Sequence, residues 1–331
     1  MPFCYNDPMR AITLVRIEGP DGLELAAVAE PPGGDRIVVA VHAAGVGFPD
    51  LLMTRGRYQF RPEPPFVPGV EMAGTVRSAP PGSPFAPGDR VAAWAPLGAW
   101  AEYAVAAPIA TFRIPEGMSY AQATSLVNYQ SAYFGLVERG QARAGETVLI
   151  HGAAGGVGSA AVDLARGLGL TSIAVARGGE KLAVAHDLGA QHLLDADSDW
   201  LPEVKRITGE RGVDLVFDPV GGDRFLDSVR ALAVGGRLLV VGFAGGSIPE
   251  VKVNRLLLKN SSVVGVAWGE YVRHDHEMPQ RVGRALADLW SAGKLHPLVG
   301  ATFPLERAAD ALREIESRRA TGKIVLTVRD P

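Results

Sequence analysis

The feature that most constrains the fold is a glycine-rich segment, GAAGGVG at 152–158, between an apolar strand and a helix. It follows TVLIH and precedes SAAVDLARGLG. Glycines in such a loop let the backbone approach a pyrophosphate, and the helix N-terminus supplies unpaired N–H groups and the positive end of the helix dipole. The loop predicts a dinucleotide site at Gly155, Gly156, Val157 and Gly158.

Strands and helices alternate from residue 145 to residue 268. The strand cores VLI, LVF and LLVV are continuously apolar, which is typical of a parallel sheet covered by helices on both faces. A regular βαβ alternation predicts a doubly wound domain of the α/β class. We therefore expect a Rossmann domain over residues 125–268.

The part before residue 115 has a different pattern, with short strands separated by Gly/Pro turns such as GPDG and PPGG. It predicts a β-rich unit. A helical stretch follows, with Ser119 as its expected N-cap. The helices and the strand expected after residue 268 do not continue the alternation, so we expect them to return to the β-rich unit, which would comprise residues 1–124 and 269–331.

The choice between NAD and NADP is made at the end of the second strand of the Rossmann domain. NAD sites place an acidic residue there to bind the ribose 2′-hydroxyl group. This sequence has Arg177 and Lys181 instead, and their charges suit a 2′-phosphate group. Glu180, at the start of a helix, can complement the helix dipole. The sequence therefore predicts NADPH as the cofactor.

Composition excludes several classes of protein. A chain of 331 residues favours two domains. The net charge of −3, without a basic stripe, argues against nucleic acid or a membrane as a partner. Cys4 is the only cysteine, which excludes a disulfide framework and a zinc site built on cysteine pairs. No signal peptide or membrane span is evident, so a cytoplasmic enzyme is expected.

The turn AAGVGFPDLL near the N-terminus carries a single acid, Asp50. Two interpretations are open: a buried or capping aspartate, and part of the wall of an active site.

The order of motifs resembles the medium-chain dehydrogenase/reductase superfamily. These motifs are the β-rich unit, the AAGGVG loop, FDPVGG, GGRLLVVGF and a terminal TGKIVL. The resemblance extends from about Met9 to the end of the chain, and it is strongest to the zinc-independent quinone oxidoreductase branch. It implies a GroES-like catalytic domain, made of the N-terminal part and the tail, with a Rossmann domain inserted between them.

The resemblance also interprets the turn. Zinc-dependent members place metal ligands at positions that correspond here to Gly47, Val70 and Val127, so no metal site is expected. Without a Lewis acid, hydride transfer favours an acceptor that delocalises the charge itself, such as a quinone or an α,β-unsaturated carbonyl compound. Asp50 and Glu71 are then expected to be structural first, with a catalytic role for Asp50 as the lesser alternative.

Other candidates follow from segments similar to the family's active-site walls. Tyr58 could donate from its phenol, Asn128 and Ser131 could contact nicotinamide, and Arg319 could approach cofactor or substrate. The alternative for each is an ordinary polar residue near the domain interface. We also expect cofactor contacts from Gly242, Phe243 and Trp268. Two departures are that Gly47 replaces the asparagine usual in quinone reductases, and that Ala196 replaces a tyrosine often found near the adenosine.

The leading functional hypothesis is an NADPH-dependent reductase of quinones or activated alkenes acting on a small molecule. The alternatives are an enoyl-thioester reductase of the same superfamily and a non-catalytic NADPH-binding protein similar to the lens crystallins of this family. Relatives pair the strand that corresponds to residues 262–266 across a two-fold axis, so the resemblance also implies a homodimer. His274 and His276 are interpreted as part of a solvated loop.

Overall fold

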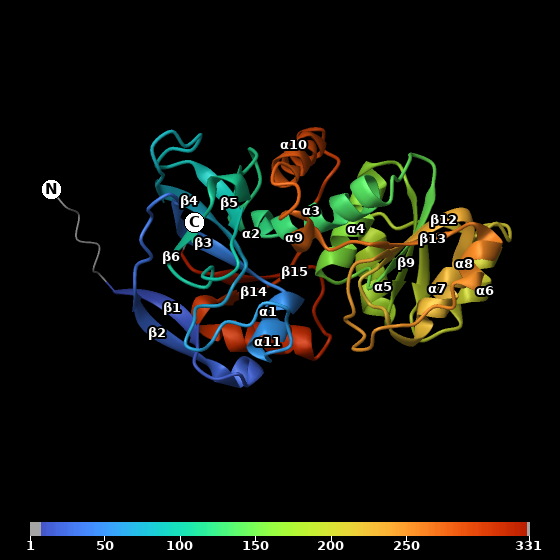
Figure 1. Ribbon diagram of the computed structural model, residues 1–331, viewed down its shortest axis with the longest axis horizontal. Coiled ribbons are helices and arrows are strands. Elements are labelled where there is room, and N and C mark those ends of the chain that lie inside the picture. The colour runs from blue at the N-terminus through green and yellow to red at the C-terminus, as the bar shows by residue number, and fades with distance from the viewer. Residues whose placement is uncertain (1–7, 330–331) are drawn as a thin grey trace. The chain divides into compact units, whose positions relative to one another are not determined.

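The computed structural model describes residues 8–329. Its contacts divide the chain into two compact units: unit 1 is Met1–Val127 with Pro297–Pro331, and unit 2 is Asn128–His296. Figure 1 traces the chain from its N-terminal strands in blue to the terminal helix and strands in red.

Unit 1 is built around a seven-stranded sheet in the order β14-β15-β3-β4-β5-β7, with β6 also paired to β3. The central strand β3 runs antiparallel to β4, β6 and β15. The strand expected at 322–328 is β15, and it pairs with β3 (Figure 1), so the tail does return to the β-rich unit. The strands of unit 1 are β1 (Pro8–Leu14), β2 (Leu23–Ala29), β3 (Ile37–Val46), β4 (Glu71–Ser78), β5 (Arg90–Trp94), β6 (Tyr103–Ala106), β7 (Thr111–Arg113), β14 (Val299–Pro304) and β15 (Lys323–Thr327).

Among the described residues, three α-helices lie wholly in unit 1: α1 (Phe48–Thr54), α2 (Tyr120–Ala123) and α11 (Ala308–Glu316). Its core combines aliphatic side chains of the sheet with fully buried Trp100, whose Nε1 donates to the carbonyl of Gly45 over 3.0 Å. This contact fixes the end of β3, from which the Asp50 turn departs.

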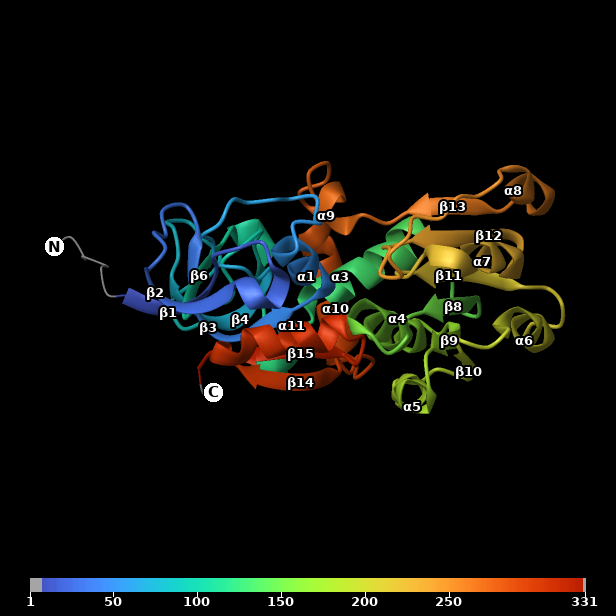
Figure 2. The same ribbon diagram turned by 90° about the horizontal axis from the view of Figure 1, so that it is seen from below.

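Unit 2 contains six parallel strands in the order β10-β9-β8-β11-β12-β13. Counted along the chain this is 3-2-1-4-5-6, the order of dinucleotide-binding sheets. Figure 2 shows the strands from β13 through β8 to β10. The α/β class and the doubly wound domain are therefore confirmed. The strands of unit 2 are β8 (Thr147–His151), β9 (Thr171–Ala176), β10 (His192–Asp195), β11 (Val213–Asp218), β12 (Leu232–Val240) and β13 (Ser262–Gly265).

The helices of unit 2 connect these strands and cover the sheet. Leu149, Val216 and Leu238 are inaccessible to solvent in the core, which explains the apolar strand segments. The helices are α3 (Leu126–Tyr133, which begins in unit 1), α4 (Gly156–Gly167), α5 (Gly179–Asp187), α6 (Trp200–Ile207), α7 (Phe225–Ala231), α8 (Asn254–Lys259), α9 (Trp268–Tyr271) and α10 (Met278–Ser291).

The compact units differ from the expected domains at residues 125–127, which group with unit 1, and at residues 269–296, which group with unit 2. The reason for the second difference is the packing of α10. The side chain of Gln130 donates to the carbonyl of Pro279 over 2.9 Å, and Arg281 pairs with Glu138 at 3.2 Å. Burial of Val282 adds apolar contact. The sequence assigns α10 to the β-rich unit because periodicity shows which face of a helix is apolar but not what covers it.

The helical stretch after residue 117 begins as expected. The Gln122 N–H donates to Ser119 Oγ over 3.2 Å, and the Ser119 N–H donates to Gln122 Oε1 over 3.0 Å, which forms a capping box. The stretch is not one helix, since α2 ends at Ala123, α3 follows, and a π-helical segment covers Phe134–Arg139.

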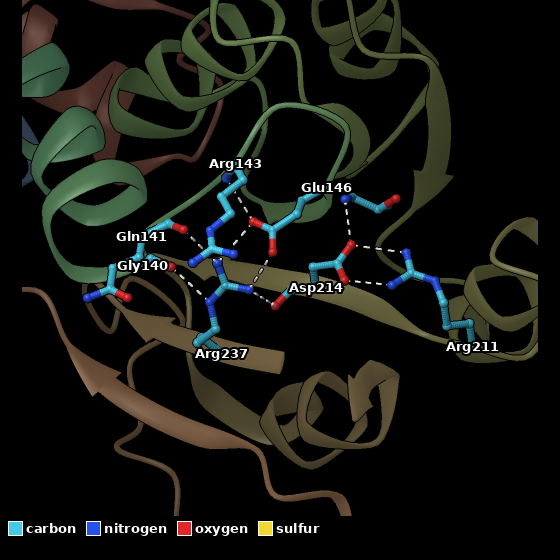
Figure 3. A network of polar contacts seen from close by, with 8 residues as sticks. Gly140, Gln141, Arg143, Glu146, Arg211, Asp214 and Arg237 are labelled. Atoms are coloured by element: carbon cyan, nitrogen blue, oxygen red, sulfur yellow. Dashed lines mark hydrogen bonds and ion pairs between the residues drawn. The ribbon is translucent and has the colours of Figure 1, made fainter. Parts of the chain in front are cut away.

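A network of charged side chains joins β12, β11 and the segment before β8 (Figure 3). Arg237 forms two 3.0 Å bonds to the carboxylate of Glu146 and donates to the carbonyl of Gly140 over 2.8 Å. Asp214 pairs with Arg211 and accepts from the Thr147 N–H over 2.8 Å. These contacts tie together the amino ends of the central strands, at the opposite end of the sheet from the candidate cofactor site.

Candidate functional site

The glycine loop joins β8 to α4 at the carboxyl edge of the sheet in unit 2. Gly152 has a φ of +59°, and a Cβ on Gly158 would lie 2.0 Å from the Gly152 carbonyl oxygen. Only glycine at position 158 permits this approach of helix to strand. No side chain caps the helix at Gly155. The N–H groups of the first turn of α4 can therefore donate hydrogen bonds to a bound anion. The loop therefore fits a pyrophosphate.

The loops after β11 and β12 lie against each other at the same edge. The Ala244 N–H donates to the Pro219 carbonyl over 3.1 Å, and Phe243 is 38% exposed. Asp218 at the end of β11 is buried, and its Oδ1 accepts from the N–H groups of Val220 and Gly221 over 2.8 and 2.9 Å. Gly242 and Phe243 thus lie on the edge where ligands of such sheets bind.

Sequence analysis did not single out Asp218. The available signal was an acid at a strand end directly before a Pro/Gly turn, because such an acid can accept hydrogen bonds from the turn amides.

His151 is the last residue of β8, directly before the phosphate loop, and its Nε2 lies 2.8 Å from Ser228 Oγ. Burial lowers the pKa of His151, so a neutral imidazole packs beneath the phosphate loop.

The two cations predicted for a 2′-phosphate lie at the end of β9 and the start of α5. The Arg177 side chain is 61% exposed and pairs with Asp197 at 2.9 Å. Lys181 is half-buried in the first turn of α5. Glu180 lies in the first turn of that helix, as the dipole argument expects. Arg177 therefore has an exposed carboxylate partner that sequence analysis did not anticipate.

Helix α3 presents two candidates on one face and two anchors on another. Asn128 and Ser131 are three residues apart and half-buried, so they are neighbours on the helix surface. Tyr129 is buried, and its hydroxyl donates to Asp163 over 2.6 Å. The side chain of Gln130 donates to the Pro279 carbonyl. These two anchors, Tyr129 and Gln130, fix the rotation of α3, which determines where Asn128 and Ser131 point.

The remaining candidate of unit 2, Trp268, begins α9 and is 5% exposed.

The Asp50 turn in unit 1 is a helix start. Asp50 lies in the first turn of α1, is 3% exposed, and its Oδ2 accepts from the Gly47 N–H over 2.8 Å. Its Oδ1 is buried without a hydrogen-bond partner in the part of the chain that the structure describes. Burial raises the pKa of Asp50 to about 7, while the Gly47 N–H and the charge of Lys323 act in the opposite direction. The carboxyl group therefore keeps its proton to a higher pH than an exposed aspartate does.

The positions that correspond to the metal ligands carry no donor side chain, since they are Gly47, Val70 and Val127. Between residues 8 and 329 no group of three His, Cys, Asp or Glu side chains could bind a metal ion. Cys4 lies outside the described residues. The residues present therefore do not fit a catalytic zinc ion.

The two remaining candidates lie in unit 1. Tyr58 is half-buried in the segment after α1, and its carbonyl accepts from Arg61 Nε over 3.0 Å. The Arg319 side chain is 65% exposed and pairs with Glu314 at 3.0 Å. Among the described residues, no helix is long and apolar enough to cross a membrane.

The fold and the loop together define a class of protein. A parallel sheet in the order 3-2-1-4-5-6 with a glycine-rich phosphate loop, next in sequence to a β-rich unit built from both ends of the chain, is the architecture of dinucleotide-dependent dehydrogenases and reductases. The alcohol dehydrogenase GroES-like domain model matches residues 33–116, and the zinc-binding dehydrogenase model matches residues 156–287.

Individual relatives identify the branch. Quinone oxidoreductase-like protein 2 of Rattus norvegicus is 37% identical over 325 residues, which cover 97% of this chain and 92% of the relative. A probable oxidoreductase from Mycobacterium abscessus has a TM-score of 0.90 at 44% identity over 97% of this chain and 99% of its own. The quinone oxidoreductase of Thermus thermophilus, solved also as its complex with NADPH, has a TM-score of 0.82 at 36% identity over 97% of this chain and 100% of its own. The chain belongs to the medium-chain dehydrogenase/reductase superfamily, in its quinone oxidoreductase branch.

Proposed function

We propose that this protein is an NADPH-dependent oxidoreductase that delivers hydride, without a metal ion, to a quinone or an α,β-unsaturated carbonyl compound. The observation that carries the proposal is the combination of a complete phosphate loop with metal-ligand positions occupied by Gly47, Val70 and Val127. Because these positions cannot hold a zinc ion, hydride transfer is favoured to an acceptor that delocalises the incoming negative charge itself.

The proposed cofactor contacts come from separate parts of the chain. The N–H groups of Gly156, Val157 and Gly158 would bind the pyrophosphate, with Gly155 leaving room for its approach. The remaining contacts would come from Ser131, Arg177, Lys181, Gly242, Phe243, Trp268 and Arg319. Bound NADPH would supply the hydride. The NADPH complex of the Thermus relative supports this choice.

Arg177 and Lys181 would select the 2′-phosphate. The pairing of Arg177 with Asp197 is no obstacle, because both side chains are 61% exposed and exposed ion pairs contribute about 0–1 kcal/mol. A phosphate dianion accepts stronger, charge-assisted bonds from a guanidinium group.

The chain must also stabilise the oxyanion that develops on the acceptor. The candidates are the Tyr58 hydroxyl and the Asn128 side-chain amide, each able to donate a hydrogen bond, with Asp50 as a further titratable group. The reduced acceptor takes up one proton, and the Tyr58 hydroxyl is the side-chain donor we assign to that step. A drop in turnover number in Tyr58→Phe, with unchanged NADPH affinity, would support this assignment.

A panel of acceptors tests the proposed function. NADPH oxidation is followed with benzoquinone, phenanthrenequinone and crotonyl thioesters. We expect turnover with at least one quinone or enone. Preference for the thioester would identify an enoyl-thioester reductase, whereas tight NADPH binding without turnover of any acceptor would overturn the proposal and favour a non-catalytic binding protein.

We also propose that the protein forms a homodimer through the free side of β13. This strand ends the six-stranded sheet, and beside it α8 exposes Leu257 and Leu258 by 74% and 81%. Val253 and Ile248 are exposed by 75% and 77%. An unpaired edge strand flanked by large apolar side chains is a template for pairing with a second chain.

A further inference from the structure

A buried ion pair spans the end of strand β3 in unit 1. Lys323 and Glu71 are the first residues of β15 and β4, the two strands that flank β3. The Lys323 ammonium group contacts Glu71 Oε2, with side-chain exposures of 2% and 7%. A Cβ on Gly45 would lie 2.6 Å from Glu71 Oε2 and from Lys323 Cε. The missing side chain at Gly45 therefore makes room for the pair.

Both carboxylate oxygens of Glu71 are used. While Oε2 contacts Lys323, Oε1 accepts from the Val127 N–H over 2.9 Å. Val127 occupies the position of the third metal ligand of zinc-dependent relatives, and Asn128 follows it directly. One carboxylate thus connects β4, β15 and the first turn of α3.

The residues around the pair carry no metal-ligand side chains at the three positions that correspond to the zinc ligands, which are Gly47, Val70 and Val127. Here Asp50 closes the turn through the Gly47 N–H, and Glu71, next to Val70, connects to Val127. Lys323 supplies the buried positive charge, and a buried carboxylate requires such a partner.

We propose that Glu71, held by Lys323, is a positioning residue that fixes the start of α3, with Asn128 and Ser131, for hydride transfer. The proposal rests on the proposed function for its kinetic consequence, but not for its structural one. The proposed positioning role differs from simple stabilisation of the fold. The ion pair joins β4 to β15, and Glu71 also accepts a hydrogen bond from the Val127 N–H at the start of α3.

The test removes both charges together. Lys323→Met alone leaves Glu71 buried and unpaired, so that variant can fail to fold. The double variant Glu71→Leu/Lys323→Met keeps the site neutral, and replacing both ions of a buried pair by apolar groups of similar volume is often tolerated. In Glu71→Gln/Lys323→Met, a matched neutral control, the glutamine carbonyl can still accept from the Val127 N–H.

The readouts are the hydrogen-exchange rate of the Val127 amide, the NADPH dissociation constant, Tm, and kcat against KM for the acceptor. In the leucine variant we expect faster exchange at Val127 and a kcat lower by roughly ten- to a hundredfold, with Tm and NADPH affinity near wild type. The glutamine variant should recover most of both losses. Wild-type kcat and wild-type exchange at Val127 in a folded leucine variant would overturn the proposal.

A measurement on the unaltered protein covers the case in which neither double variant folds. The Val127 amide should exchange as slowly as amides of the β3–β4 ladder, because Glu71 protects it. Exchange at the rate of an exposed loop would overturn the proposal. Failure of the proposed function is recognised separately, by absence of NADPH oxidation in the wild-type protein with every acceptor.

Discussion

At the residue scale, several charged side chains of unit 1 are buried, although their residue types are usually exposed. Asp50 and Glu71 are both buried acids close to Lys323, yet Glu71 uses both oxygens while Asp50 Oδ1 has no partner among the described residues. The sequence predicts that both are structural first, and each accepts a hydrogen bond from a backbone N–H group, Asp50 from Gly47 and Glu71 from Val127. Lys323 was not predicted, because a lysine in TGKIVL has no sequence signal for burial.

Asp50→Asn should stabilise the protein increasingly as pH rises. The pKa of Asp50 is raised from 3.8 to about 7, so between these values the folded protein binds a proton that the unfolded chain has lost. Stability of the wild type therefore falls as pH rises through this window. A shift of about three units corresponds to about 4 kcal/mol. Asparagine does not titrate and should avoid this loss.

Thermal unfolding at several pH values checks this prediction. The Tm difference between Asp50→Asn and wild type should grow from about pH 4 to about pH 7 and then level off. The control is Asp187→Asn, because the Asp187 side chain is 82% exposed. A Tm difference that does not change with pH would show that burial does not govern the ionisation of Asp50.

Arg177→Ala should weaken the use of NADPH selectively. A hydrogen bond to a charged group contributes about 1.5–3 kcal/mol, so we expect the KM for NADPH to rise roughly ten- to a hundredfold. The KM for NADH, which has no 2′-phosphate, should change little. Arg206→Ala, which removes an exposed arginine of α6 paired with Glu203, is the control. A lower KM for NADH than for NADPH in the wild type would contradict the cofactor assignment.

At the scale of elements, the strongest prediction from sequence was the strand–loop–helix unit at residues 147–167. Its glycines are required by geometry, since a Cβ on Gly158 would overlap the Gly152 carbonyl, and this requirement is visible in sequence. The contact between the loops after β11 and β12 could not be predicted in the same way, because it consists of backbone hydrogen bonds between segments that are far apart in the chain. The capping box at Ser119 was predictable because it is local.

Gly158→Ala should displace α4 from β8. The added methyl group would lie 2.0 Å from the Gly152 carbonyl oxygen, and such overpacking costs about 1–3 kcal/mol. NADPH affinity should fall as well, because the first-turn N–H groups of α4 move with the helix. Gly179→Ala is a matched control at the first residue of α5, where a Cβ meets nothing within 4 Å. Equal Tm and equal NADPH affinity for both variants would contradict the role of Gly158.

At the scale of the whole molecule, the order of elements predicted two units with the tail returning to the first, and β15 pairs with β3 as expected. The assignment of α10 could not be made from its sequence, because its partners Gln130 and Glu138 lie more than a hundred residues away. Burial of an apolar face is local information, but the surface that covers it is not.

The proposed dimer makes a prediction at the same scale. Leu257→Asp/Leu258→Asp places charges on the exposed face of α8, so we expect the mass measured by light scattering to fall from that of a dimer to that of a monomer. Leu25→Asp, at a 49% exposed position of β2, should leave the mass unchanged. A wild-type protein that is monomeric at all concentrations would exclude the dimer.

We propose that the protein transfers hydride without a metal ion, because the positions of the zinc ligands in zinc-dependent members of the superfamily are Gly47, Val70 and Val127 here. The most direct measurement is the rate of NADPH oxidation with a quinone acceptor before and after exhaustive removal of metal by a chelator, with metal content determined on the same samples. We predict an unchanged rate in metal-free protein and no increase on adding zinc. Loss of the rate on chelation, and its recovery with zinc, would contradict the claim.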